Sequence, residues 1–264
     1  MMKDRQDVFR KRKIKYTIIF IVVAVIFFGS SALTDFKTTD GIFAIPRAIG
    51  WMVTNLIPDQ KAWERFPKIW NKLIETALLS VAVTVVSGIC AFAFSLLGSR
   101  TTKGVGWTGR VVRIVASFFR NVPDVVWAML LMFSFGQNII TGFLALFFTT
   151  FGLLTRAFIE TIDEVSSECV EALTATGADF VQIVFQGIIP SSIAGIITWI
   201  LYMIETNIRS STLIGILTAT GIGYMFDLYY KRLDFGTASL VVIAIVVLVI
   251  IIELISNKIR KAII

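Results

Sequence analysis

The chain has no histidine and only two cysteines among its 264 residues. Without histidine it cannot build a Ser-His-Asp hydrolase, a histidine-ligated metal site or a histidine proton relay. Cys90 and Cys169 are interpreted as unpaired, reduced thiols, so we expect no disulfide framework. The sequence also lacks a GxxxxGK[ST] loop, so the chain cannot hydrolyse ATP through a P-loop of its own. We therefore expect no catalytic residue, no metal ligand and no bound cofactor, and any energy from ATP must come from another subunit.

Charge is also scarce, because charged residues make up 16% of the chain and hydrophobic residues 56%. With a mean hydropathy of +0.81, the chain has more apolar surface than a soluble domain of this length buries. A bilayer core of about 30 Å needs roughly 20 apolar residues per helix, and six runs qualify. They are residues 16–32, 76–97, 114–135, 139–158, 183–204 and 237–252. The sequence predicts an all-α, polytopic membrane protein with about six transmembrane helices.

The remaining segments divide the chain further. Residues 1–15 form a basic N-terminus and residues 16–32 an anchor helix, although the following "GSSALT" resembles a signal-peptide cleavage site. Residues 33–75 are predicted to be extracytoplasmic, with "IFAIPRAIGWMVTNLIP" as an interfacial helix or, alternatively, a solvated loop. Residues 76–264 form the transmembrane domain, which includes a cytoplasmic loop at 160–182. The short run 213–225 is interpreted as a re-entrant segment or a short gate helix.

Positive residues give the orientation, because lysine and arginine flanks resist translocation. Seven of them lie before the first span, which predicts a cytoplasmic N-terminus. Six crossings then place Arg100, Lys103, Arg110 and Arg113 inside, together with a C-terminal tail that carries three more. Topology and anionic lipid at the inner surface explain the net charge of +7, so membrane lipid is an expected partner and nucleic acid is not.

One polar stretch, "EALTATGADFVQIVFQGIIP", separates two of the hydrophobic runs. Its first part, with the preceding residues, predicts a short amphipathic helix with an apolar stripe at Ile162, Val165, Cys169 and Leu173. Gly177 is a candidate left-handed helix stop, and Asp179 can cap the next helix. A helix lying at the lipid headgroups remains one interpretation. The acids and the absence of bases after Arg156 favour docking into a groove on a partner protein.

The same stretch resembles the EAA loop of permeases of bacterial ATP-binding-cassette (ABC) importers. The match consists of Glu171-Ala172, Gly177 and Ile189-Pro190 at the family spacing, with Leu173, Gly187 and Ile189 departing from the family residues. The resemblance implies the type I importer permease fold and a coupling role for this loop. It also implies an ABC ATPase subunit that carries ATP and Mg, an extracytoplasmic solute-binding protein, and a homodimer in the bacterial cell membrane.

Further segments are similar to the phosphonate importer permease. They are "FFRNVPDVVWAMLLMFSFG", "GLLTRAFIETIDEV" and "ETNIRSSTLIGILTATGIG". The resemblance covers most of the chain and implies phosphonate, or a related phosphorus oxyanion such as phosphite or phosphate, as the cargo. Where the family has G-A-G-G-I-G, this chain has "TATGIG", and the substitution of two glycines by threonines concerns the predicted gate at Gly215, Gly221 and Gly223.

Charged residues within or beside the spans are candidates for the substrate pathway. Arg209 is predicted at the outer end of the fifth span, where Ser210, Ser211 and Thr212 add hydroxyls that suit an oxyanion. Arg120 in the third span is a second candidate. The alternative for both arginines is a structural pair with the carboxylate four residues away, Glu205 for Arg209 and Asp124 for Arg120.

Two functions of other classes compete with an ATP-driven importer. A secondary transporter or anion channel would need no ATPase, but it usually shows an inverted repeat and buried relay acids, and neither is clear here. A membrane enzyme acting on lipid phosphate would need clustered histidine, aspartate or metal ligands. The sequence therefore favours an importer permease that does no bond chemistry itself.

Overall fold

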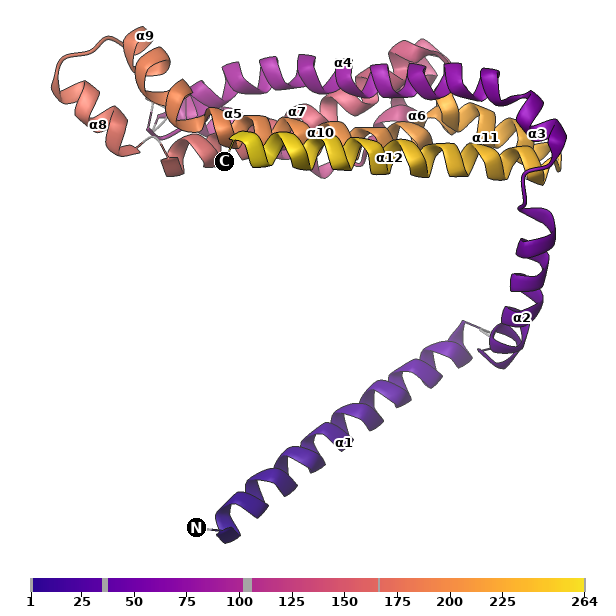
Figure 1. Cartoon of the computed structure of the whole chain (residues 1–264). Coiled ribbons are helices and arrows are strands. Elements are labelled where there is room, and N and C mark those ends of the chain that lie inside the picture. Colours follow the sequence, from indigo (N-terminus) through magenta and orange to yellow (C-terminus); the bar gives the residue numbers. More distant parts are fainter. Residues whose placement is uncertain (1, 35–37, 102–105, 166, 264) are drawn as a thin grey trace. The chain divides into compact units, whose positions relative to one another are not determined.

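The computed structural model describes residues 2–34, 38–101, 106–165 and 167–263. Lys103, which the sequence places in a cytoplasmic loop, and Asp35, in the segment predicted to be extracytoplasmic, lie outside these ranges. The described residues form helices and no strand (Figure 1). They divide into two units, Met1–Leu56 and Ile57–Ile264, each considered by itself.

The first unit contains α1 (Met2–Leu33) and α2 (Thr38–Asn55). Within α1, residues Arg10–Leu33 form an apolar stretch of 24 residues, which is long enough to span a bilayer. This stretch includes the predicted anchor at 16–32. The segment with Trp51 is helical and contains Pro46, so it is not an irregular loop, and its position at the outer interface stays a prediction.

The second unit is a helical bundle. It begins with α3 (Gln60–Glu64), α4 (Phe66–Gly98), α5 (Trp107–Asn121), α6 (Asp124–Phe135) and α7 (Ile139–Val165). It continues with α8 (Ser167–Ala175), α9 (Phe180–Gln182), the π-helical segment Ile183–Ile188, α10 (Ile189–Thr218), α11 (Gly221–Lys231) and α12 (Phe235–Ile263). Figure 1 shows α8 and α9 at one end of this bundle and α3 at the other.

Helix α7 is the centre of the bundle and contacts α4, α5, α6 and α10. Small residues let the neighbouring helices approach it closely. A Cβ on Gly152 would lie 2.6 Å from the backbone nitrogen of Arg120 and 2.7 Å from the carbonyl oxygen of Ala116. Glycine at this position therefore fixes how closely α5 crosses α7.

The third predicted span differs from the sequence expectation. Residues 114–135 do not form one helix, because α5 and α6 meet at an angle of 88°. Pro123 lies at the break and causes it, since proline has no N–H to donate and its ring clashes with the preceding helical turn. By length and composition, the described residues therefore provide five spanning helices, or six if the bent pair counts as one span.

The fifth predicted span is longer than its hydrophobic run. Instead of ending at residue 204, the helix continues from Phe180 to Thr218 over 39 residues. Pro190 lies at the start of α10, directly after the π-helical turn, and the wider turn accommodates the missing proline hydrogen bond. The run 213–225 is split at Ala219, which has a φ of 55°, between the end of α10 and the short helix α11.

Candidate functional site

The turn after α8 has the geometry expected of a glycine helix stop. Gly177 has a φ of +81°, its N–H donates to the carbonyl oxygen of Thr174 at 3.1 Å, and the N–H of Ala178 donates to that of Leu173 at 3.1 Å. These two bonds form a Schellman motif, which favours glycine at the left-handed position. The backbone N–H of Asp179 then donates to Gln182 Oε1 at 2.9 Å, which begins the next helix.

Helix α8 packs against the π-helical segment that leads into α10 and leaves its acidic face outside. Val170 joins Ile162, Val184 and Ile188 in one apolar cluster. A Cβ on Gly187 would lie 2.9 Å from Leu173 Cδ1, so the glycine makes room for α8. Part of the stripe that the sequence assigns to a partner is therefore used within the chain, while Val165 stays exposed.

The residues of the predicted coupling loop fall on two faces of this element. Glu171, Ala172, Gly177 and Pro190 are exposed, and Ile189 is half-buried. Glu171 also lines a cavity of about 450 Å³ with Arg100, Thr101, Val170 and Thr174. The exposed residues form a surface at the end of the bundle that a second protein can reach.

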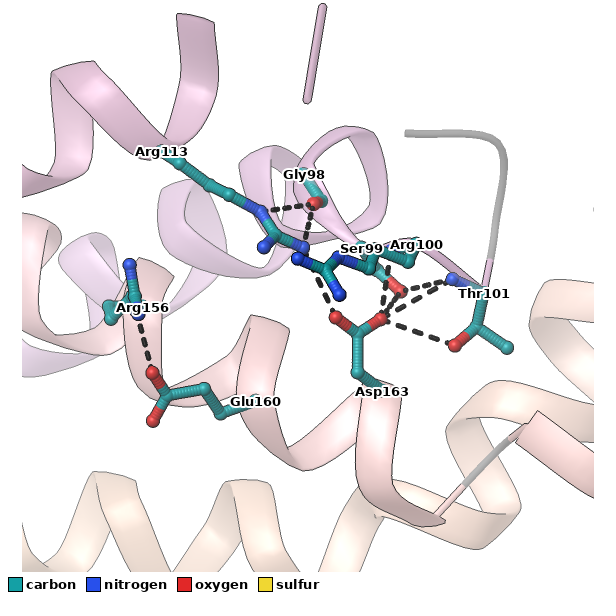
Figure 2. A network of polar contacts seen from close by, with 8 residues as sticks. All are labelled: Gly98, Ser99, Arg100, Thr101, Arg113, Arg156, Glu160 and Asp163. Atoms are coloured by element: carbon teal, nitrogen blue, oxygen red, sulfur yellow. Dashed lines mark hydrogen bonds and ion pairs between the residues drawn. The ribbon is translucent and has the colours of Figure 1, made fainter. Parts of the chain in front are cut away.

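A second cluster lies directly beside this element, and the sequence analysis did not identify it (Figure 2). Asp163 Oδ1 accepts hydrogen bonds from the hydroxyl of Ser99 at 2.5 Å, from the backbone N–H of Arg100 at 2.8 Å, and from the N–H and hydroxyl of Thr101 at 3.3 and 3.2 Å. Asp163 Oδ2 pairs with Arg113 Nη2 at 3.2 Å. In the sequence, the sign of this cluster is the spacing of Asp163, which lies four residues after the buried residue Ile159 and therefore on the same side of α7.

Arg113 connects this carboxylate to the end of α4. Its Nε and Nη2 donate to the carbonyl oxygen of Gly98 at 3.1 and 3.0 Å. Gly98 is the last residue of α4, and a guanidinium satisfies the free carbonyl groups and the negative end of the dipole there. Three helices, α4, α5 and α7, therefore meet at Asp163 and Arg113.

Arg209 lies inside α10 rather than at the end of the helix. It donates to Glu205 Oε1 at 2.8 Å, so the pairing considered as its structural alternative is present. Glu205 Oε2 also faces Arg260 Nη2 of α12 at 3.6 Å. The side chain of Glu205 is 13% exposed and that of Arg209 is 53% exposed, which leaves about half of the Arg209 side chain accessible.

The sequence analysis assigned Arg260 of α12 only to the basic C-terminal tail. Arg260 Nε is buried and has no hydrogen-bond partner among the described residues. Two guanidinium groups therefore share one carboxylate, which gives this part of the bundle a local excess of positive charge. Such an excess attracts anions.

Arg120 behaves differently from Arg209. It is exposed near the end of α5, and Asp124 begins α6 beyond the break. Among the ion pairs of the described residues, none joins the two side chains. Asp124 Oδ1 instead accepts from the N–H of Val125 at 2.9 Å. The pairing expected at a spacing of four residues fails because it needs a continuous helix.

The hydroxyls beside Arg209 are engaged within the bundle. Ser211 is 4% exposed, lies 3.1 Å from Ser80 Oγ and donates to the Ile208 carbonyl oxygen. Thr212 donates to the same carbonyl oxygen. Ser210 is half-buried, and of the three hydroxyl residues only Ser211 is fully buried.

A buried polar residue that the sequence analysis did not single out lies between Glu205 and Arg209. Asn207 Nδ2 donates to Thr84 of α4 at 2.9 Å, and Asn207 Oδ1 accepts from Thr150 of α7 at 3.1 Å. Thr84 and Thr150 lie near the middle of their helices, so Arg209 lies at the middle of the bundle. Hydrogen bonds between transmembrane helices of this kind fix their register.

The three glycines of the predicted gate form a tight joint between α10 and α11. A Cβ on Gly223 would lie 1.9 Å from the carbonyl oxygen of Thr212, and one on Gly215 would lie 2.5 Å from that of Thr220. Gly221 has a φ of +60° and no room for a Cβ beside Thr76. All three glycines are therefore required for packing, while their role in gating stays a prediction.

The threonines that replace family glycines are buried beside this joint. Thr218 is fully buried and Thr220 is 8% exposed, and their hydroxyls lie 2.9 Å apart. A Cβ on Gly142 of α7 would lie 3.5 Å from the hydroxyl of Thr218. The two hydroxyls thus serve packing against α7.

At the opposite end of the bundle, α3 is fastened to the turn between α11 and α12. Arg65 forms an ion pair with Asp234, donates to Thr237 Oγ1 at 3.0 Å and lies over the Tyr229 ring at 5.1 Å. Burial raises the pKa of Asp234, but hydrogen bonds from the Thr237 side chain and backbone and the Arg65 guanidinium outweigh it and hold this pKa below its ordinary value. The ionised carboxylate thus stabilises this end.

Metal and thiol chemistry have little support in the described part of the chain. Its acids and cysteines form no group of three or more that could hold a metal ion. Cys90 and Cys169 are both free. The arrangement instead combines spanning helices, an exposed helix at one end and charged groups in the middle, which defines a polytopic membrane transport subunit.

The chain belongs to the family described as "Binding-protein-dependent transport system inner membrane component", which matches residues 94–263. It is therefore a multi-pass inner-membrane subunit of a transport system. The family implies two partners, an ATPase and a solute-binding protein. The sequence-based assignment to this class of permease is confirmed.

Three relatives are named as permeases for phosphite or phosphate. The chain is 28% identical over 231 residues to a protein of Stutzerimonas stutzeri named as a phosphite transport system permease, HtxC, with 81% of this chain and 82% of the relative covered. It is 28% identical over 188 residues to the phosphate-import permease protein PhnE of Mycolicibacterium smegmatis, with 71% of this chain and 35% of that longer relative covered. It is 25% identical to the phosphite transport system permease protein PtxC of Stutzerimonas stutzeri, covering 72% and 69%.

Solved structures confirm the fold. An inward-facing structure of the MetNI methionine ABC transporter matches with a TM-score of 0.61 at 22% identity, covering 75% of this chain and 98% of that chain. An amino acid ABC transporter with histidines matches with a TM-score of 0.63 at 16% identity, covering 75% and 95%. The predicted all-α, type I ABC importer permease fold is therefore confirmed.

Proposed function

We propose that this chain is the permease subunit of an ATP-driven importer that carries a phosphorus oxyanion, namely a phosphonate, phosphite or phosphate, into the cell. The names of the relatives support this class of cargo. Two accessible or partly accessible arginines, Arg209 and Arg260, share a single carboxylate, which suits an anionic cargo because guanidinium groups bind such oxygens bidentately.

In this proposal the chain forms a homodimer that encloses the pathway in the bacterial cell membrane, surrounded by lipid. Both termini and the loop 160–182 face the cytoplasm, and the end of the bundle with α3 faces the solute-binding protein. One ABC ATPase subunit docks on the exposed turn with Glu171 and Gly177 in each loop and carries the ATP and Mg. The permease makes and breaks no bonds and converts the ATPase movement into alternating access.

The observation that carries the coupling proposal is the exposed turn at the end of α8. Glu171, Ala172 and Gly177 are exposed beside a rigid Schellman turn, and the helix behind them packs on the π-helical segment that leads into α10 at Ile189 and Pro190. Because hydrogen bonds fix this turn, a force applied to it is transmitted to the spanning helix α10. The π-helical turn at Pro190 is the place where α10 can change its winding.

The pathway in this proposal passes Arg209, a charged residue of α10 whose side chain is 53% exposed. Ser210 and Thr212 lie at its edge, Ser211 supports α10 from within the bundle, and Arg120 guides the anion along the broken span. Binding is weak, because a pathway has to release its cargo. Gly215, Gly221 and Gly223 form the joint at which the gate opens and closes.

The proposed function is tested by uptake into proteoliposomes that contain this chain, its ATPase and its solute-binding protein. We expect ATP-dependent uptake of radiolabelled phosphite, phosphate or a methylphosphonate, and none without ATP. Glutamine and methionine serve as control substrates. Uptake that continues without the ATPase would establish a secondary carrier instead.

A further inference from the structure

The charged residues at the cytoplasmic end of α7 include two that differ in what they contact (Figure 2). Glu160 pairs with Arg156 of its own helix, four residues earlier, at 2.6 Å. Among the described residues, the side chain of Asp163, three residues later, receives its hydrogen bonds from outside α7, from the segment 99–101 and from α5. A single carboxylate therefore connects α7 to two other helices.

Asp163 lies at the end of α7 that leads into α8. Helix α7 ends at Val165 and α8, the helix with the exposed Glu171, begins at Ser167. Asp163 therefore lies within the last helical turn of α7 before α8. Its partners lie at the end of α4 and on α5, both of which extend along the bundle. A displacement of α8 that moves the end of α7 therefore reaches α4 and α5 through this carboxylate, beside the packing of α7 against both helices.

Arg113 makes the connection stiff. Its guanidinium is held at once by the Gly98 carbonyl oxygen and by Asp163, so it cannot follow one partner without pulling the other. Hydrogen bonds in which one or both partners are charged are stronger than neutral ones. The side chains of both residues are only a quarter exposed, which limits screening by water and salt.

We propose that Asp163 is a positioning residue for energy coupling, because it transmits the movement of α8 to α4 and α5 when the ATPase subunits close. This inference rests on the proposed function as an ATP-driven importer. Without the carboxylate, α8 moves with the ATPase while α4 and α5 lag behind. ATP hydrolysis then continues, but less cargo crosses the membrane for each ATP consumed.

The test compares Asp163→Asn with Glu160→Gln in the reconstituted importer. Asparagine has the same shape, but its amide group places N–H donors against the donors of Arg113 or of the segment 99–101. We expect Asp163→Asn to lower the ratio of cargo transported to ATP hydrolysed by about tenfold, a size typical of coupling energies. Glu160→Gln, three residues away on the same helix, should leave this ratio unchanged.

A purely structural role would give a different result. It would lower the yield or the thermal stability of the complex without changing the ratio in the molecules that assemble, and this result would overturn the proposal. If Asp163→Asn does not assemble, the decision rests on Thr101→Val, which removes one hydroxyl hydrogen bond of 3.2 Å and keeps the side-chain shape. We expect a twofold to threefold lower ratio, and an unchanged ratio would overturn the proposal.

The same experiment separates this inference from the proposed function. Wild-type proteoliposomes that show no ATP-dependent uptake would refute the importer itself, and the role of Asp163 with it. Wild-type uptake that is normal, together with identical ratios for Asp163→Asn and Glu160→Gln, would refute only the role of Asp163.

Discussion

Substitution of Gly223 by alanine should separate α10 from α11. The added Cβ would lie 1.9 Å from the carbonyl oxygen of Thr212, 2.9 Å from the backbone nitrogen of Ile216 and 3.0 Å from the carbonyl carbon of Thr212. The shortest distance is about 1.5 Å less than the 3.4 Å at which ordinary contact begins. All three atoms belong to the backbone, so no side chain can rotate away and the two helices have to move apart.

The cost of this separation is that of an overpacked core. Forced insertion of a methyl group into a packed interior typically destabilises by about 1–3 kcal/mol, and the rigid backbone on both sides places Gly223→Ala at about 3 kcal/mol. A change of this size lowers the Tm of a protein of about this length by roughly 6–12 °C. The hydrogen bond from the Thr220 N–H to the Gly215 carbonyl oxygen, 3.1 Å long, should break as the joint opens.

The assay is thermal unfolding of the purified protein in detergent, followed by tryptophan fluorescence, with Gly142→Ala as the matched control. A Cβ on Gly142 faces the same end of α10, but its nearest atom is a side-chain methyl group of Ile214 at 3.5 Å, which is ordinary contact. We expect Gly142→Ala to unfold within about 2 °C of the wild type. Equal melting temperatures for Gly223→Ala and the wild type would refute the close approach of α10 and α11.

Three further predictions concern the charged and polar residues. Arg209→Gln should raise the cargo concentration needed for half-maximal uptake by about tenfold while ATP hydrolysis still responds to the binding protein, because one charge-assisted contact is lost; unchanged uptake kinetics would exclude Arg209 from the pathway. Asn207→Leu should destabilise the bundle by about 1–2 kcal/mol, because Thr150 keeps a buried hydroxyl without its acceptor; Thr206→Val, on the neighbouring position, is the control in the same melting assay. Asp234 should make stability depend on pH: its pKa is lowered in the folded state, so its contribution is present above the ordinary value of 3.8 and is lost as the pH falls through the folded pKa. Asp234→Asn should therefore be less stable than the wild type at pH 7 by on the order of 1 kcal/mol, given partial screening by solvent, and the difference should persist down to about pH 4 and disappear only on further acidification through the folded pKa; a difference that is already lost above pH 4 would contradict the lowered pKa.

The helices and the coupling loop could be predicted because their signals are local. Hydrophobic length identifies a spanning helix without any tertiary information. Gly177 was predictable as a left-handed stop because glycine tolerates the positive φ that ends a helix in this way. The family resemblance then gave the loop its expected role.

The features that the sequence did not reveal depend on contacts between distant segments. The helix continues beyond residue 204 through a polar stretch because Asn207 finds partners 123 and 57 residues away, in Thr84 and Thr150. The Asp163 cluster likewise joins residues 50 to 64 positions apart. Pro123 lies inside a run that hydrophobic length predicts as one span, and the angle of 88° at this break is set by how α5 and α6 each pack against α7.

The apolar stripe of the loop was predicted from its periodicity, but the surface that covers it was not. Periodicity placed Cys169 and Leu173 on one face of the short helix α8, although Ile162 and Val165 of the same stripe belong to α7, and it does not say what covers that face. Gly187 lets α8 lie against the π-helical segment before α10, so Leu173 and Cys169 meet their own chain. The surface left for a partner is the exposed turn with Glu171 and Gly177.

The central claim is that this exposed turn couples ATP hydrolysis in a partner to transport by this chain. The most direct measurement is cargo uptake together with ATP hydrolysis in proteoliposomes that contain the ATPase and the solute-binding protein, comparing the wild type with Glu171→Lys and Gly177→Asp and with a charge reversal at the exposed Lys258 of α12, Lys258→Glu, as a control. We expect both loop variants to insert normally and to lose most of the uptake supported by ATP, while the control transports like the wild type. Uptake that is unchanged in both loop variants, or that proceeds without the ATPase, would contradict the claim.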